Sequence, residues 1–88
     1  MRNERTATVI LASGQSEKFH LDGKPSSKIL QRTVEGKPKA IVVDYQGRSA
    51  TMFVNSNTSG LRFNQVATKI SGSTKIFGDA VVVVGYRF

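Results

Sequence analysis

Basic side chains at helical spacing form the strongest chemical pattern in this chain. Lys24, Lys28 and Arg32 follow one another at intervals of four residues, and Lys37 and Lys39 come shortly afterwards. Because residues four apart lie above one another on a helix, we expect the first three to form a row. Such a row of cationic groups can follow the phosphates of a nucleic acid. A solvated helix face has the same pattern, and this alternative stays open.

The tripeptide Gly-Lys-Pro occurs twice, at residues 23–25 and 36–38, and two serines follow the first copy. A nucleotide-binding phosphate loop has a glycine five positions before its Gly-Lys pair. Lys18 occupies that position here. We therefore read the two tripeptides as the start and the end of a helix, and not as a nucleotide site.

Side chains suited to catalysis are few and scattered. His20 is the only histidine, and a hydrolase would need it beside Ser13 or Ser16, with Asp22 to orient the ring. The carboxylates stand singly along the chain, and there is no cysteine to ligate a metal. The sequence therefore predicts a protein that is not an enzyme, with no catalytic residues, no metal site and no cofactor.

Charge and length narrow the class of protein further. The 88 residues include 13 Lys and Arg against 6 Asp and Glu, a formal net charge of +7 that favours polyanionic or acidic partners. A hydrophobic content of 39% suits one globular domain over residues 1–88. The longest apolar run, residues 80–84, is too short to cross a membrane, and no apolar leader is recognisable. We expect a cytosolic protein without membrane contact.

The elements that must position the basic row start with two strands and a helix. Residues 5–12 alternate, with Ala7 and Val9 on one face and Ile10 on the other, and residues 17–21 suit a second strand after a turn. Residues 25–36 have the signals of a helix: Pro25 in the first turn, Ser26 or Ser27 as the cap, and Gly36 in the left-handed conformation at the end.

Within that helix, Ile29, Leu30 and Val34 form the stripe that we expect to face a sheet. Residues 40–45 and 48–55 are β-rich and flank Gln46-Gly47, the strongest hairpin signal in the chain. Asn64 suits the cap of a short helix reaching Ile70, with an extended segment as the alternative. Residues 80–88 begin with adjacent apolar positions, as expected of a central strand.

The predicted fold class is α+β, in the order β-β-α-β-β-(α)-β. About five strands form a small antiparallel or mixed sheet, and one main helix packs on a face.

Part of this pattern resembles an uncharacterised family of small phage and plasmid proteins. The shared features are Leu30-Gln31-x-x-Val34-x-Gly36, a hydrophobic hairpin ending Asn55-x-Asn57, Gly60-Leu61-x-x-Asn64-x-x-Ala67, and Ile76-x-Gly78-Asp79 before a valine strand. They span about residues 28 to 85. Where that family has a second glycine and an Ile-Glu pair, this chain has Glu35-Gly36 and then two lysines. The resemblance implies a phage or mobile-element setting and the same fold, with no chemistry to carry over.

Two functions are consistent with these observations. The first is a non-enzymatic protein that binds nucleic acid or a nucleoprotein through Lys24, Lys28, Arg32, Lys37 and Lys39. Outward-facing aromatic rings would add stacking on single strands, the candidates being Phe19, Tyr45, Phe53, Tyr86 and Phe88. The alternative is a phage-encoded inhibitor that covers an acidic host or defence protein in the host cytosol.

Overall fold

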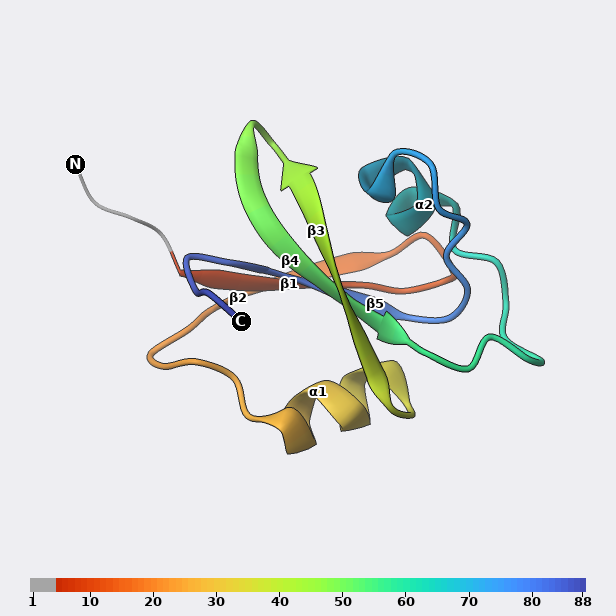
Figure 1. Ribbon diagram of the computed structural model, residues 1–88, viewed down its shortest axis with the longest axis horizontal. Helices are drawn as coiled ribbons and strands as arrows, with labels where there is room; N and C mark the ends of the chain where they lie inside the picture. Colours follow the sequence, from red (N-terminus) through yellow and green to blue (C-terminus); the bar gives the residue numbers. More distant parts are fainter. Residues whose placement is uncertain (1–4) are drawn as a thin grey trace.

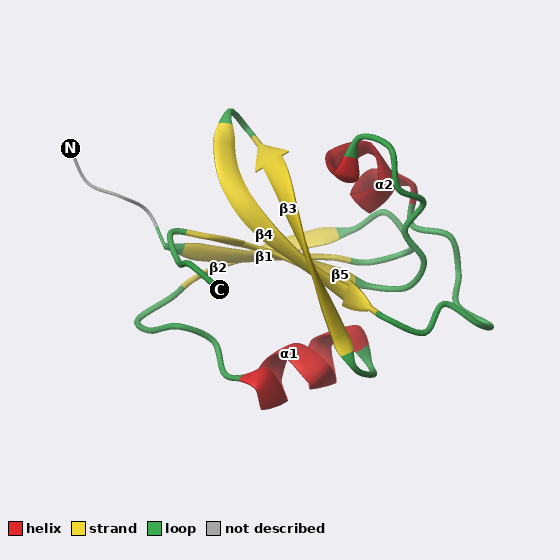
Figure 2. Cartoon of the chain, viewed as in Figure 1, coloured by secondary structure: helices red, strands yellow, loops and turns green. Residues whose placement is uncertain are grey.

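The computed structural model describes residues 5–88, which form an antiparallel five-stranded sheet with one short helix on each face (Figures 1 and 2). This is the predicted α+β order, with the sheet antiparallel throughout. The elements are β1 (Thr6–Ile10), β2 (Ser16–His20), α1 (Ser27–Val34), β3 (Pro38–Tyr45), β4 (Arg48–Asn55), α2 (Gln65–Ser71) and β5 (Ala80–Val84).

The strands lie in the order β2-β1-β5-β4-β3, so the C-terminal valine strand is central, as predicted. Every residue of β5 is buried. Val81 and Val83 pack towards α1, together with Leu30, Val34 and Phe53. Their neighbours on β5 face the opposite way and join the apolar cluster that includes Ala67 of α2. A helix therefore covers each face, and β5 has no polar side to expose.

Two hairpins build the outer strands of this sheet. In the first, Ala7 pairs with Phe19, and β1 presents Ala7 and Val9 to α1 but Ile10 to α2, as its alternation predicts. In the second, β3 and β4 pair along their full length around Gln46 and Gly47. Both turn residues have positive φ, 53° and 79°, the requirement of the tight turn that matches strand twist. The predicted hairpin is confirmed.

Helix α1 begins at a serine cap, as predicted. The Ser26 hydroxyl accepts a hydrogen bond from the Ile29 amide at 3.2 Å, and Pro25 lies outside the helix instead of in its first turn. Leu30 and Val34 are buried against the sheet, but Ile29 is 57% exposed. The expectation for Ile29 was wrong because two residues four apart already fill the narrow contact line of a short helix.

The carboxyl end of α1 differs from the prediction. Glu35, not Gly36, adopts the left-handed conformation, with φ of 60°, and the Gly36 amide donates to the Gln31 carbonyl at 3.0 Å. Gly36 meets a different need, because a Cβ there would lie within 2.9 Å of three atoms of the Asn55 side chain. A neighbouring strand, which local sequence cannot place, therefore decides where glycine is required.

Helix α2 is a true helix, which settles the alternative between helix and extended segment. Its cap, Asn64, is fully buried, and the Oδ1 atom accepts from the Ala67 amide at 3.0 Å. The Nδ2 atom donates to the carbonyls of Ile10 and Gly78 at 2.9 and 2.8 Å. This one side chain joins α2 to the end of β1 and to the loop before β5. Within residues 5–88, neither helix has the length and apolarity needed to cross a bilayer.

Candidate functional site

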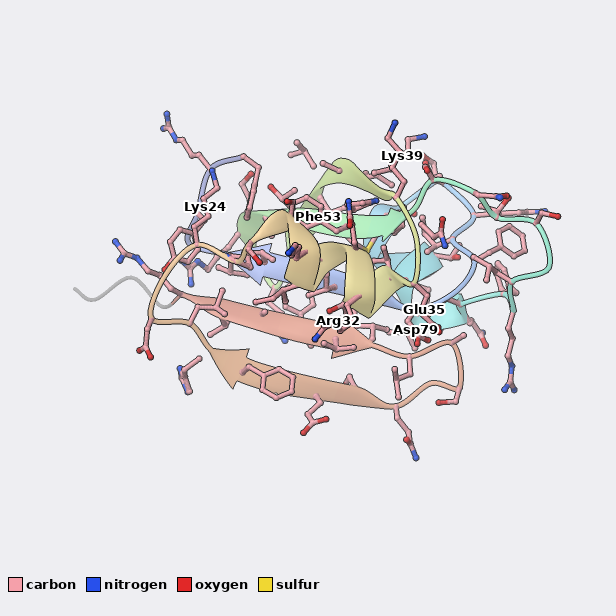
Figure 3. The ribbon with its side chains drawn as sticks, turned by 90° about the horizontal axis from the view of Figure 1, so that it is seen from below. Lys24, Arg32, Glu35, Lys39, Phe53 and Asp79 are labelled. Atoms are coloured by element: carbon pink, nitrogen blue, oxygen red, sulfur yellow. The ribbon has the colours of Figure 1, made fainter. Side chains whose placement is uncertain are left out.

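Lys28 and Arg32 lie on the outward side of α1. Both side chains are exposed, and they occupy the helix face opposite Leu30 and Val34. Figure 3 looks at this side of the molecule and shows Arg32 in front of the sheet. The spacing of four residues therefore places these two cations one helical turn apart and free to contact a partner.

Lys24 lies before the helix, and its side chain is directed to the C-terminal segment. Its Nζ atom is 4.7 Å from the centre of the Phe88 ring, a distance typical of a cation–π contact. Phe88 in turn packs edge-on against Phe53, with the ring centres 4.8 Å apart. Lys24 therefore connects the amino end of α1 to the C-terminal segment, residues 85–88.

The structure does not bring Lys39 onto this surface. Lys39 lies on the side of β3 that carries Ile41, where it lines a small depression with Lys75 on the α2 side of the sheet. Lys37 is exposed just beyond the carboxyl end of α1. Lys24 and Lys39 are well separated in Figure 3. Of the five cations predicted as a stripe, Lys28 and Arg32 share one face of α1, Lys24 lies against the C-terminal segment, Lys37 follows the carboxyl end of α1, and Lys39 lies on the other face of the sheet.

A hollow of about 510 Å³ continues the basic surface beyond Phe88. We call it the C-terminal hollow. The described residues that line it include two arginines and no aspartate or glutamate: Val42, Arg48, Ser49, Ala50, Thr51, Gly85, Tyr86, Arg87 and Phe88. Phe88 is 48% exposed, so one aromatic ring stands at the edge of a positively charged concavity.

Tyr86 adds two features to this hollow. The guanidinium carbon of Arg5 lies 5.3 Å from the centre of the Tyr86 ring, which places a further cation at the same end of the sheet. The Tyr86 hydroxyl is buried without a hydrogen-bond partner within residues 5–88. A polar group of this kind is satisfied when a ligand or water reaches it.

Sequence spacing pointed to the helix row but missed Arg5, Arg48 and Arg87. These arginines come from the residue before β1, from β4 and from the C-terminal segment, and only the strand order brings them together. The one local signal was the alternation of Tyr86, Arg87 and Phe88, because two of the named candidate aromatics flank an arginine.

A second concave surface is apolar. It lies between α1 and the β1–β2 hairpin, has a volume of about 470 Å³, and is lined mainly by aliphatic and aromatic side chains. Two large apolar residues on it are substantially exposed, Phe19 at 45% and Ile29 at 57%. We call it the apolar groove. Its outer wall is β2, an edge strand whose residues are all exposed.

The groups weighed for catalysis do not come together. His20 and Ser16 stand at opposite ends of β2, roughly 13 Å apart at the rise of an extended chain. Asp22 and Ser13 lie in the loops beyond the two ends of that strand. Among residues 5–88, no three His, Asp or Glu side chains gather in a group suited to a metal ion.

Comparison of this chain with protein-family models, with curated proteins and with solved structures finds no match.

Proposed function

We propose that this protein binds nucleic acid, with a preference for single strands, through the surface formed by Lys24, Lys28, Arg32, Arg48, Arg87 and Phe88. We call this the basic–aromatic surface. The observation that carries the proposal is the convergence of cations from separate segments around an exposed phenylalanine, in a hollow whose described lining has no aspartate or glutamate.

Each part of this surface has a role in such binding. Lysine and arginine side chains neutralise phosphates and release condensed counterions, which supplies affinity without reading sequence. An exposed ring beside them offers a face on which a base can stack, and a base is available for stacking when it is not paired. The contact between Lys24 and Phe88 keeps charge and ring together. No bond is made or broken in this function, so the protein acts as a binding module and not as an enzyme.

Fluorescence anisotropy with a labelled single strand and a matched duplex tests the proposal. We expect the single strand to bind more tightly than ~10⁻⁴ M at physiological salt. Replacing Arg48 and Arg87 together by glutamine should weaken both complexes about tenfold or more. Phe88→Leu should weaken the single-strand complex selectively, since one base stack contributes roughly 1 to 3 kcal/mol.

A matched control uses cations that do not line the C-terminal hollow. Lys69 is in α2 and Lys75 follows it, and the double change to glutamine removes the same charge from the chain. If this control weakens binding as much as the arginine pair does, overall charge accounts for the effect and the proposed surface is wrong.

The apolar groove favours a second function, inhibition of an acidic host or defence protein. Its occupant would be an extended acidic segment of the target that pairs with the free edge of β2 and inserts apolar side chains beside Phe19 and Ile29. Lys24 lines this groove, and Lys28 lies on the same helix, so both could meet the acidic side chains. The phage or mobile-element setting and the host cytosol belong to both proposals and rest on the resemblance described above.

Pull-down from host lysate with and without nuclease distinguishes the two functions. Loss of all partners after nuclease treatment supports the basic–aromatic surface. A nuclease-resistant protein partner that is lost with Phe19→Ser, but kept with the Arg48 and Arg87 double change, supports the inhibitor instead.

A further inference from the structure

Strand β3 is a free edge of the sheet. It lies at the end of the order β2-β1-β5-β4-β3, and among the described strands it pairs with β4 alone. Neither helix runs along its outer edge (Figure 1). At eight residues it is longer than β2, the five-residue strand at the opposite edge. An edge strand leaves backbone N–H and C=O groups unpaired, and these can bind a further strand.

The hydrogen-bond pattern of the β3–β4 hairpin indicates which groups of β3 are unpaired. The Ser56 amide donates to the Lys37 carbonyl at 2.9 Å, just before β3 begins, and bonds of this kind recur at every second residue of an antiparallel pair. The odd-numbered residues of β3 therefore bond to β4. Ala40, Val42 and Asp44 direct their N–H and C=O groups to the free edge.

The middle of this edge has none of the usual features that keep edge strands apart. Residues 40–43 are Ala-Ile-Val-Val, without a charge or a proline, and their pairing with β4 has no bulge. Val42 is 79% exposed, more than any other large apolar side chain among residues 5–88. The unpaired backbone groups therefore stand beside an apolar side chain that one copy of the chain leaves in water.

The sequence of β3 is complementary to itself about Val42. When two copies lie antiparallel about a two-fold axis at this residue, Val42 meets Val42 of the second copy, and Ile41 meets Val43 of the second copy. Ala40 then lies opposite Asp44 of the second copy, so all three outward-directed residues of each strand form hydrogen-bonded pairs.

The charges of β3 are compatible with this register. Its two charged residues, Lys39 and Asp44, fall opposite Tyr45 and Ala40 of the second copy, so no like charges face each other. Strand β2 is less suited to pairing with itself. A register centred on its middle residue would set Lys18 against Lys18 of the second copy, which is unfavourable.

We propose that this protein forms a two-fold symmetric homodimer in which the two β3 edges pair antiparallel about Val42. The two five-stranded sheets then form one continuous sheet. Because Val42 also lines the C-terminal hollow, the hollows of the two copies meet at the dimer axis. The dimer does not depend on nucleic-acid binding, and every measurement below is made without nucleic acid.

Sedimentation equilibrium of the whole chain tests the proposal. The average mass should rise with concentration from that of one chain towards that of two, with a dissociation constant of about 10⁻⁵ M, as suits a short contact. Added sodium chloride should strengthen the dimer, because each copy has a net charge of +7 and the interface has no ion pair. A chain that stays monomeric up to ~10⁻³ M overturns the proposal.

Val42→Lys should weaken the dimer at least tenfold, because it sets two ammonium groups against each other at the axis. The exposure of Val42 means that the fold should be kept, which far-ultraviolet circular dichroism checks. Ile29→Lys is the matched control, since it adds the same charge at an apolar side chain that is 57% exposed beside the apolar groove. If only the Ile29 change weakens the dimer, the groove is the interface and the proposal is wrong.

Mild oxidation of single-cysteine variants tests the register, since the chain has no cysteine of its own. Across a hydrogen-bonded pair the Cα atoms are about 5.5 Å apart, a separation that a disulfide can span. Val42→Cys should therefore form a covalent dimer. Ala40→Cys lies on the same face of β3, but its two copies would be roughly 13 Å apart along the strands and should not cross-link. Equal cross-linking of both variants would overturn the proposed pairing.

Discussion

Asn55 closes the carboxyl end of α1 from a neighbouring strand. Its Nδ2 atom lies 3.2 Å from the carbonyl oxygens of both Val34 and Glu35, two groups that a helix end leaves without partners. Its Oδ1 atom accepts from the Asn57 amide at 2.9 Å. Gly36 permits this approach, because its missing side chain leaves room for the Asn55 amide.

Gly36→Ala should therefore destabilise the protein by about 1 to 3 kcal/mol, the usual cost of overpacking a well-filled site. Chemical denaturation measures the change. Gly23→Ala is the matched control, since a Cβ there meets no atom within 4 Å and the backbone has no positive φ. In an Asn55→Ala background the cost of Gly36→Ala should shrink. An equal cost in both backgrounds would contradict the steric explanation.

At the scale of elements, α1 holds to the sheet through two adjacent turns. Leu30 and Val34 are 6% and 2% exposed, while the next residue to Leu30, Ile29, lies on the flank above the apolar groove. Helix propensity alone would not hold eight residues in water, so this packing maintains the helix.

Leu30→Ala should reduce the free energy of unfolding by roughly 2 to 5 kcal/mol, as expected for a buried leucine. Ile29→Ala removes a side chain of the same size from the exposed neighbour, and its effect should be much smaller. Thermal or chemical unfolding of the two variants compares them directly. Equal losses would show that both residues face the sheet.

The β3–β4 turn gives a prediction in the stabilising direction. Gln46 has a φ of 53°, a conformation that costs most side chains energy but that asparagine tolerates. Gln46→Asn creates the Asn-Gly pair preferred in this turn and should stabilise the fold by about 0.5 to 1 kcal/mol. A lower unfolding midpoint in the variant would show that the Gln46 side chain makes a contact that stabilises the fold more than the asparagine improves the turn.

At the scale of the whole molecule, the two sides of the sheet differ in what they offer a partner. The α1 side has the apolar groove and most of the basic–aromatic surface, whose Arg48 also lies beside α2-face residues, and Lys39 and Lys75 lie on the α2 side. The formal net charge of +7 attracts a polyanion to the whole molecule over a distance. The side chains of one surface then determine where the polyanion makes close contact.

Salt dependence separates these two contributions. If about 3 to 5 phosphates are contacted, the logarithm of affinity for nucleic acid should fall against the logarithm of salt with a slope of roughly −2 to −4.5. Replacing Lys28 and Arg32 by glutamine should make the slope shallower by about 1.5 to 2. The same change at Lys37 and Lys39 should alter it less, because the fold turns Lys39 away. A larger effect of the Lys37 and Lys39 change would support a single continuous row of five cations.

Local sequence determined the elements of this protein. Turn chemistry at Gln46-Gly47, the caps Ser26 and Asn64, and period-two alternation in β1 all act within a few residues, so each can be recognised without knowing the fold. The run of valines similarly predicted a central strand, because a strand without a polar face needs cover on both sides.

Tertiary structure decided which residues from distant parts of the chain are neighbours. The order β2-β1-β5-β4-β3 brings Arg48 and Arg87 to Phe88 and places Asn55 against Gly36. Strand alternation sends Lys39 to the other face from α1. The spacing of residues in the sequence does not predict these contacts, because they join residues far apart in the chain. They depend on the order of the strands, which the packing of the whole core selects.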